Sequence, residues 1–323
     1  MLLLEFENII AKIEAEIQEI ENKISAVQDK GKKPTKETTD KLKTLRKNLQ
    51  TELKKIYANL GAWDKQTVAR HPDRPHAIDY ITTLIHDFVE LAGDRRFAND
   101  NTIIGGIGFM GDIPVIVIGQ EKGKSIGEKQ HRNFGMPKPE GYRKAIRLMN
   151  LASKMSLPIV TFVDTPGAYP GADAEARGQA EAIARSIQAC LQSEQPIVSV
   201  VIGEGGSGGA IALASADSII MLENSVYSTI SPEGCAAILW KSSDAKIDAA
   251  KALRITADDL KKLGIIDIIV KEPIGGAHRN PKQAIESVGD AIYSELKRLL
   301  KIKNIRHSRE EKFLNMTMNV GKK

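Results

Sequence analysis

The residues best suited to chemistry in this chain are glycines. Five of them fall within the seven-residue segment GEGGSGG at 203–209, which follows the apolar run PIVSVVI and precedes a short apolar stretch. This pattern predicts a buried strand that turns directly into a helix. Glycine leaves the main chain open to a ligand, and the first amides of a helix have no partner within the helix. The segment therefore predicts a site where main-chain N–H groups meet an anion.

A dinucleotide-binding enzyme is one interpretation of the segment. Gly203, Gly205 and Gly208 satisfy the pattern G-x-G-x-x-G, and Glu223 lies at a suitable distance along the chain for an acid that binds a ribose. Against this interpretation, the helix expected after Gly209 has only about two turns, which is shorter than the usual crossover helix of such a unit.

A serine hydrolase is the second interpretation. Ser207 stands in G-x-S-x-G, and acids and His278 follow in the order that a catalytic triad needs. The pattern arises easily in glycine-rich sequence, however, and no H-G-G-G segment accompanies it.

In the third interpretation the amides themselves are the functional groups and form an oxyanion hole at the start of a helix. Loss of one donor from such a hole typically costs about 2.7–4 kcal/mol of transition-state stabilisation. This interpretation accounts for the number of glycines, whereas a tight turn alone would need only two or three of them.

A second loop, DTPGAYPG at 164–171, follows another predicted strand. Pro166 and Pro170 stiffen the turn, Gly167 lets its backbone approach a ligand, and Tyr169 offers a flat wall. Asp164 could act as a base, although capping the turn is the simpler role for it. Because both glycine-rich loops leave successive strands at their carboxyl ends, we expect them to converge on one crevice.

The remaining sequence indicates the elements that position these loops. Strands at 103–109 and 113–120 are expected to form a hairpin, and helices are expected from Pro139, over about 174–192 and over about 282–301. Strands that are apolar on both faces and alternate with helices predict an α/β architecture with a buried sheet.

The first part of the chain follows a different pattern. Apolar residues recur three and four positions apart on both sides of a polar break that contains Gly31 and Pro34, which predicts a helical hairpin. We therefore expect a helical arm at 1–60, one large domain at 61–301 and a charged, frayed tail at 302–323.

Composition narrows the function classes further. With 42% hydrophobic residues and only two cysteines, each in an apolar helical pattern, the chain is expected to be globular, cytoplasmic and free of disulfides, metal sites, signal peptide and membrane spans. The net charge of +5 is concentrated in residues 122–147, which could be a solvated face or a region that contacts an anion. No aromatic interleaving accompanies these cations, so the sequence does not predict nucleic acid as a partner.

Six segments carry a resemblance to a known family. They are LAGDRRF, RNFGMPKPEGYRKAIRLM, VDTPGAYPG, VIGEGGSGGA, STISPEGCAAILWK and EPIGGAHRNP. Together they resemble the alpha subunits of bacterial acetyl-CoA carboxylase carboxyltransferase, and the likeness spans nearly the whole chain.

The resemblance implies a crotonase-like (ClpP-like) fold of repeated strand-strand-helix units. It also implies an assembly of two alpha with two beta subunits, in which the zinc-containing beta subunit supplies most contacts to acetyl-CoA. The further partners that it implies are the biotin carboxyl carrier protein and, in the wider complex, biotin carboxylase. The implied reaction transfers the carboxyl group of carboxybiotin to acetyl-CoA and gives malonyl-CoA for fatty acid synthesis, with no cofactor bound covalently to this chain. A stand-alone crotonase-like hydratase or isomerase of acyl-CoA, or an inactive scaffold subunit, is the alternative.

By the same resemblance, the amides of Gly208 and Gly209 form the oxyanion hole that stabilises the ureido oxygen of biotin. Gly205, Gly206 and the loop residues Gly167, Ala168, Tyr169 and Pro170 are expected to shape the biotin pocket around them.

Overall fold

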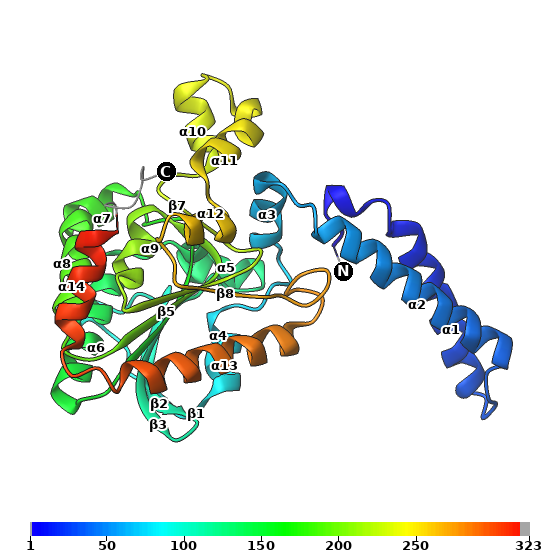
Figure 1. Ribbon diagram of the computed structural model, residues 1–323, viewed down its shortest axis with the longest axis horizontal. Helices are drawn as coiled ribbons and strands as arrows, with labels where there is room; N and C mark the ends of the chain where they lie inside the picture. The colour runs from blue at the N-terminus through cyan, green and yellow to red at the C-terminus, as the bar shows by residue number, and fades with distance from the viewer. Residues whose placement is uncertain (1, 317–323) are drawn as a thin grey trace.

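The computed structural model describes residues 2–316 and is built around one eight-stranded mixed sheet (Figure 1). Its strands are β1 Ile85–Glu90, β2 Ile103–Met110, β3 Ile113–Gln120, β4 Ile159–Thr165, β5 Ile197–Gly206, β6 Ser218–Leu222, β7 Val226–Ser228 and β8 Ile268–Val270. The order is β1-β2-β3-β4-β5-β6-β8, with β7 beside the end of β5. β1, β2 and β3 are antiparallel, whereas β3, β4, β5, β6 and β8 run parallel. The expected hairpin of β2 and β3 is confirmed.

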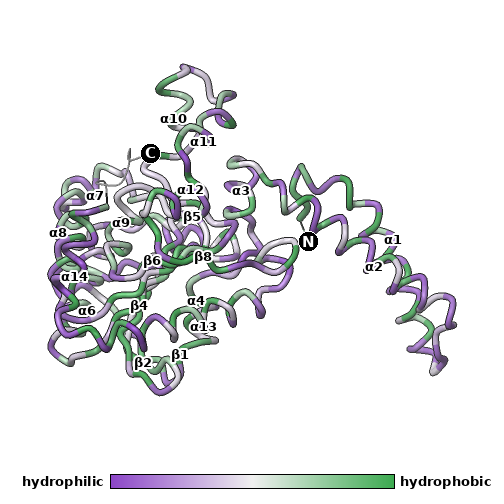
Figure 2. Tube along the Cα trace, in the orientation of Figure 1, coloured by the Kyte–Doolittle hydropathy of each residue, from purple (hydrophilic) through white to green (hydrophobic). Residues whose placement is uncertain are grey.

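The sheet is buried on both faces because its central strands carry apolar side chains on both sides. Every residue of β4 and β5 is buried. Within β4, Val160 and Phe162 pack on one face, while Ile159 and Val163 pack on the other. Figure 2 shows hydrophobic residues concentrated along these strands. The α/β architecture predicted from two-sided apolar strands is confirmed.

Helices cover the two faces of the sheet and also form separate projections. They are α1 Ala11–Gln28, α2 Lys36–Tyr57, α3 Ala62–Ala69, α4 Ala77–Leu84, α5 Ile126–His131, α6 Pro139–Met155, α7 Ala172–Ala176, α8 Gln179–Gln192, α9 Ser207–Ala214, α10 Pro232–Leu239, α11 Lys246–Leu253, α12 Ala257–Lys262, α13 Pro281–Leu299 and α14 Ile305–Asn315. α4 and α13 contribute to the core on one face of the sheet, and α6, α9 and α12 contribute to the core on the other. α10 and α11 project from the sheet (Figure 1).

The N-terminal helices α1 and α2 pack against each other and extend away from the sheet (Figure 1). The base of this arm is held by ion pairs to Arg279, in the loop that joins β8 to α13. Nη2 of Arg279 lies 2.8 Å from Oε1 of Glu7, and its Nη1 lies 2.5 Å from Oε1 of Glu14. The hydroxyl of Tyr57 donates to the same oxygen of Glu7 at 3.0 Å. The two helices match the predicted hairpin, whereas the division of the chain at 60 and 301 stays a prediction.

Two expectations about helices were wrong. The single helix expected over about 174–192 is divided into α7 and α8 at Gly178, whose φ of 81° is in the left-handed region that glycine tolerates. The expected fraying after residue 301 does not describe α14, because Arg309 on this helix is fully buried. Residues 317–323 of the predicted tail lie outside the described residues.

Arg309 anchors α14 to the opposite end of the sheet from the glycine-rich turn. Its Nη2 lies 2.5 Å from Oδ2 of Asp217, and its Nε donates to Oδ1 of the same carboxylate at 3.0 Å. Its Nη1 donates to the carbonyls of Cys190 and Ser193, each at 2.7 Å. The apolar residues of α14 do not recur at a clear helical spacing, because Arg309, which faces inward, is charged.

Within residues 2–316, none of the helices combines the length and the apolar character that crossing a membrane would require.

Candidate active site

The turn from β5 into α9 presents free main-chain donors. Gly206 precedes the helix with extended backbone, Ser207 adopts φ of 51°, and Gly208 and Gly209 complete the first turn of α9. Among residues 2–316, no carbonyl outside the helix accepts a hydrogen bond from the nitrogens of Gly208 or Gly209. Gly208 is half-buried and Gly209 is buried. Two adjacent N–H groups are therefore available at the positive end of a helix dipole.

The glycines of this turn are required by the loop beside them. A Cβ on Gly206 would clash with the carbonyl of Pro166, and one on Gly209 would lie 2.9 Å from the carbonyl carbon of Gly167. A Cβ on Gly205 would lie 3.0 Å from the ring of Tyr227. The expectation that the two glycine-rich loops converge is thus confirmed, because the turn packs directly against the loop that follows β4.

Gly208 differs from its neighbours. Among the described residues, a Cβ on Gly208 would meet only the side chain of Ile183, with Cγ2 at 3.4 Å and Cδ1 at 3.8 Å, so this position has room for a methyl group directed toward α8. Its φ lies outside the left-handed region. Packing therefore does not explain the glycine at this position.

The second loop is fixed by its backbone. The hydroxyl of Thr165 lies 2.6 Å from the carbonyl of Gly135, and it accepts a hydrogen bond from the N–H of Gly167 at 3.1 Å. The N–H of Tyr169 donates to the carbonyl of Pro137 at 3.0 Å, and Nζ of Lys138 lies 4.7 Å from the centre of the Tyr169 ring. Gly167, Ala168 and Tyr169 therefore form a defined wall beside the turn, and Pro170 follows them at the surface.

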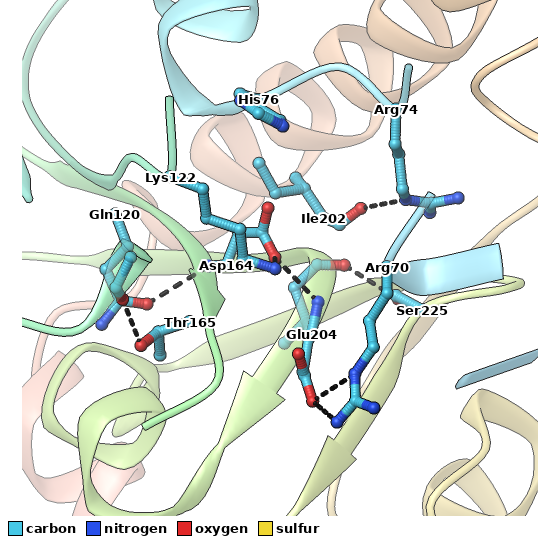
Figure 3. A network of polar contacts seen from close by, with 12 residues as sticks. Arg70, Arg74, His76, Gln120, Lys122, Asp164, Thr165, Ile202, Glu204 and Ser225 are labelled. Carbon is cyan, nitrogen blue, oxygen red and sulfur yellow. Dashed lines mark hydrogen bonds and ion pairs between the residues drawn. The ribbon is translucent and has the colours of Figure 1, made fainter. Parts of the chain in front are cut away.

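Gln120, which the sequence did not single out, joins the two loops. Its Nε2 donates to the carbonyl of Gly209 at 2.7 Å. Its Oε1 accepts from the N–H of Asp164 at 3.2 Å (Figure 3). Gln120 is fully buried at the end of β3, so both bonds are shielded from water. One amide side chain thus fixes the first turn of α9 relative to the end of β4.

A network of charged groups lies next to the glycine-rich turn, at the ends of β4 and β5 (Figure 3). Oδ1 of Asp164 lies 2.5 Å from Nζ of Lys122 and accepts from the N–H of Glu204 at 2.9 Å. Oε1 of Glu204 accepts hydrogen bonds from Gln66 at 2.8 Å and from Nη2 of Arg70 at 2.6 Å. Burial acts to raise the pKa of Glu204, but Lys122 and Arg70 outweigh it and hold the pKa below its usual value. These carboxylates are committed to structure. Asp164 was expected to cap its own turn, but its carboxylate binds Lys122 and the N–H of Glu204, and it is the hydroxyl of Thr165 that accepts from the N–H of Gly167 in the turn.

The cations of residues 122–147 do not form one patch. Lys144 is buried, donates to the carbonyls of Asp100 and Ile103, and has its pKa lowered to about 8 by burial. Three others form ion pairs with separate carboxylates, namely Lys122 with Asp164, Lys124 with Asp79 and Lys138 with Asp173. Three more donate to main-chain carbonyls, namely Arg132 to that of Asn101, Arg143 to that of Arg177 and Arg147 to that of Gly93. Neither a single solvated face nor a single anion-contact region describes these residues.

The structure does not assemble the groups that the two other interpretations need. Among the described residues, neither ring nitrogen of His278 has a hydrogen-bond partner, and the ring stacks on His71 with centroids 3.9 Å apart, so no Ser207–His278 pair is seen. Glu223, the acid that would bind a ribose, is paired with a cation instead: its Oε1 lies 2.6 Å from Nζ of Lys271. Within residues 2–316, no group of three His, Cys, Asp or Glu side chains is arranged to hold a metal ion.

The remaining chemistry is the binding of negative charge by the main chain. Two N–H donors at the start of a helix, which the adjacent loop and Gln120 hold in place, are the components of an oxyanion hole. Their catalytic role, and the pocket roles expected for the other glycines and for residues 167–170, stay predictions.

Comparisons with known proteins identify the family of the chain. A family model described as acetyl co-enzyme A carboxylase carboxyltransferase-like matches residues 9–317. The chain is 52% identical over 318 residues to the acetyl-coenzyme A carboxylase carboxyl transferase subunit alpha of Paramagnetospirillum magneticum, with 98% of each chain covered. It is 53% identical over 318 residues to the protein of the same name from Cereibacter sphaeroides, again with 98% of each covered.

Solved structures share the fold at low sequence identity. A transcarboxylase 12S structure matches with a TM-score of 0.54 and 18% identity, covering 68% of this chain and 42% of the other. A Pseudomonas malonate decarboxylase hetero-tetramer in complex with coenzyme A matches with a TM-score of 0.55 and 15% identity, covering 66% of this chain and 86% of the other. The expected crotonase-like fold is confirmed. Because the family model and these relatives match nearly the whole chain, the chain belongs to the acetyl-CoA carboxylase carboxyltransferase family and is a subunit of a carboxyl-transferring enzyme.

Proposed function

We propose that this chain is the alpha subunit of a cytoplasmic acetyl-CoA carboxylase carboxyltransferase and that it binds the carboxybiotin substrate. It would work with a zinc-containing beta subunit in a two-alpha, two-beta assembly, and the carboxyl group would come from the biotin carboxyl carrier protein after biotin carboxylase has loaded it. The product is malonyl-CoA, the first committed intermediate of fatty acid synthesis. The observation that carries this proposal is the pair of free amides at Gly208 and Gly209 in a chain of this family.

The chemistry requires donors that meet a growing negative charge. As the carboxyl group leaves biotin, charge develops on the ureido oxygen, and preorganised N–H groups stabilise it more than water does because they need not reorient. Gly208 and Gly209 would donate to this oxygen, and Gln120 would hold the carbonyl of Gly209 so that the turn keeps its shape. Loss of a single donor of this kind typically costs a factor of about 10²–10³ in kcat.

The residues around the donors would exclude water and orient the ring. Gly206 lets β5 approach the neighbouring loop, and Gly205 makes room for the ring of Tyr227 in β7. Gly167, Ala168, Tyr169 and Pro170 would form the wall of the biotin pocket. No carboxylate of this chain is assigned as a base, because Asp164 and Glu204 are bound to Lys122 and Arg70. Biotin itself would accept the proton from acetyl-CoA once its carboxyl group has left. The enolate oxygen of acetyl-CoA would then meet donors from the beta subunit.

Reconstitution with the partner tests this function. The full-length chain, purified alone and with its beta subunit, would be supplied with acetyl-CoA and carboxylated carrier protein, and malonyl-CoA would be measured. We expect product only when both subunits are present. Absence of product from the complete mixture, or hydration of enoyl-CoA by this chain alone, would contradict the proposal, the second in favour of a stand-alone hydratase.

A further inference from the structure

A cavity lined by cations lies on faces of α6 and α8 that are not used by the glycine-rich turn. Its volume is about 710 Å³. The cationic side chains that line it come from the loop after β1 and from α6 and α8, and they are Arg95, Arg96, Arg143, Arg147, Lys154 and Arg185. The acidic side chains that line it are Asp94 and Glu181.

The two acids leave most of this positive charge uncompensated. Glu181 pairs with Arg185 at 3.1 Å on the same helix. Oδ1 of Asp94 accepts hydrogen bonds from the N–H groups of Arg96, Phe97 and Ala98, so it shapes the loop. Within residues 2–316, no ion pair within 4.0 Å involves any of the other five cations.

Two of the guanidinium groups are held in place by neutral partners. Nε of Arg147 donates to the carbonyl of Gly93 at 3.0 Å, and its Nη2 donates to that of Leu91 at 2.5 Å. Nη2 of Arg143 donates to the carbonyl of Arg177 at 2.5 Å. Carbonyls orient a guanidinium without neutralising its charge, so both groups are preorganised around the cavity and keep their full charge for an anion.

The cations repel one another in the absence of such an anion. Burial lowers the pKa of Arg147, and the nearby Arg95 guanidinium lowers it further. Arg95 itself has φ of 62°, an uncommon conformation for a side chain of this size. A dense, multiply charged anion would relieve this repulsion at each cation at once.

The size and charge of the cavity favour one class of occupant. Its volume falls within the range of small-molecule sites, and its walls include only two aliphatic side chains, Ile146 and Leu151. Guanidinium groups recognise phosphate oxygens through paired hydrogen bonds. A peptide segment rich in Asp and Glu would spread its charge over a longer groove with apolar contacts.

We propose that this cavity binds the phosphate groups of a small phosphate ester or polyphosphate, at a site separate from the glycine-rich turn. The same two helices, α6 and α8, border both sites with different side chains. Tyr142 of α6 and Ile183 of α8 lie against Gly209 and Gly208, whereas Arg143 and Arg185 of the same helices line the cavity. The proposal does not depend on the identity of the carboxyl donor or acceptor.

Pyrophosphate is a direct probe of this site. Isothermal titration of the full-length chain at low ionic strength would compare the wild type with the double variant Arg95→Gln, Arg185→Gln. Neither substitution removes the hydrogen bonds that Arg143 and Arg147 make to main-chain carbonyls. We expect saturable binding by the wild type and weakening of about tenfold or more in the variant.

The matched control removes two cations elsewhere. Lys297→Gln, Arg298→Gln changes the net charge equally on α13 and should leave pyrophosphate binding within about twofold of wild type. Absence of saturable binding, or equal weakening in both double variants, would overturn the proposal. Binding of a poly-glutamate peptide but not pyrophosphate, lost in the first variant alone, would also overturn it in favour of an acidic protein partner.

Discussion

The two ends of β5 differ in what happens to the main-chain N–H groups beside them. At the amino end, the N–H of Ile197 donates to Oδ2 of Asp217 at 2.7 Å, and the buried Arg309 neutralises that carboxylate. At the carboxyl end, the chain passes into glycines whose N–H groups have no acceptor outside their helix among the described residues. Buried charged side chains close the fold at both ends, but among the described residues the carboxyl end also leaves main-chain donors free for a ligand. We therefore expect substitutions of the buried ion pairs to change stability and substitutions of the glycine-rich turn to change catalysis.

The largest expected effect is on the amino end. Arg309→Met leaves Asp217 buried without its counter-ion and should lower the free energy of unfolding by about 3–5 kcal/mol. Chemical denaturation of the full-length chain measures this change. Arg298→Met is the control, because Arg298 is half exposed in its pair with Glu295 and its loss should cost about 0–1 kcal/mol. Equal, small losses in both variants would show that α14 does not anchor the sheet.

A second buried pair lies near the carboxyl end and adds a pH dependence. Nη2 of Arg74 lies 2.5 Å from Oε1 of Glu272, and Nε of Arg74 donates to the carbonyl of Ile202 in β5 at 2.7 Å (Figure 3). Burial acts to raise the pKa of Glu272, but Arg74 outweighs it and holds the pKa below its usual value. Since the folded pKa is lowered, the stability from this carboxylate is present above the unfolded value of about 4.3 and is lost as the pH falls through the folded value.

Glu272→Gln should therefore lower stability at neutral pH by about 3–5 kcal/mol and make the acid side of the stability profile shallower than that of wild type. Denaturation midpoints measured from neutral to acid pH test both parts. A variant that loses stability in parallel with wild type at every pH would contradict the assignment of this titration to Glu272.

Substitution of Gln120 should have a smaller effect, which falls on both stability and catalysis. Gln120→Leu removes the hydrogen bond to the carbonyl of Gly209 and the one from the N–H of Asp164, at a cost of about 1–3 kcal/mol. Since the turn is then free to shift, kcat for carboxyl transfer should fall by more than KM changes. Thermal denaturation and steady-state kinetics of the assembled enzyme measure the two effects. If stability falls while kcat is retained, Gln120 supports the fold but does not position the donors.

Substitution of Ser207 should have the smallest effect. Its effect on activity distinguishes catalysis by main-chain amides from catalysis by a nucleophilic serine. Its φ of 51° suits glycine, so Ser207→Gly should leave stability unchanged or raise it by up to about 1 kcal/mol. Carboxyl transfer should stay close to wild type, because the account uses the amides and not the hydroxyl. Complete loss of activity with a stable fold would instead indicate a nucleophilic serine.

The sequence predicts the elements near the site better than the contacts that hold them. Two-sided apolar runs identify β4 and β5, and the glycine-rich segments after them identify the loops that meet. Gln120 and the chain Lys122–Asp164–Glu204–Arg70 could not be predicted, because their partners are separated by long stretches of sequence and no local pattern marks them. α14 was missed because its buried anchor is Arg309, and a charged residue is normally expected to face solvent.

The central claim is that an N–H group of the main chain, rather than a side chain, performs the chemistry at the carboxyl end of β5. The most direct measurement compares Gly208→Pro with Gly208→Ala in the assembled carboxyltransferase. Proline is tolerated in the first turn of a helix but has no N–H, whereas alanine keeps the N–H and places its methyl group against Ile183. We predict that kcat falls by about 10²–10³ in the proline variant and by less than about tenfold in the alanine variant, with both still assembled. Full activity of a folded Gly208→Pro enzyme, or equal loss in both variants, would contradict the account.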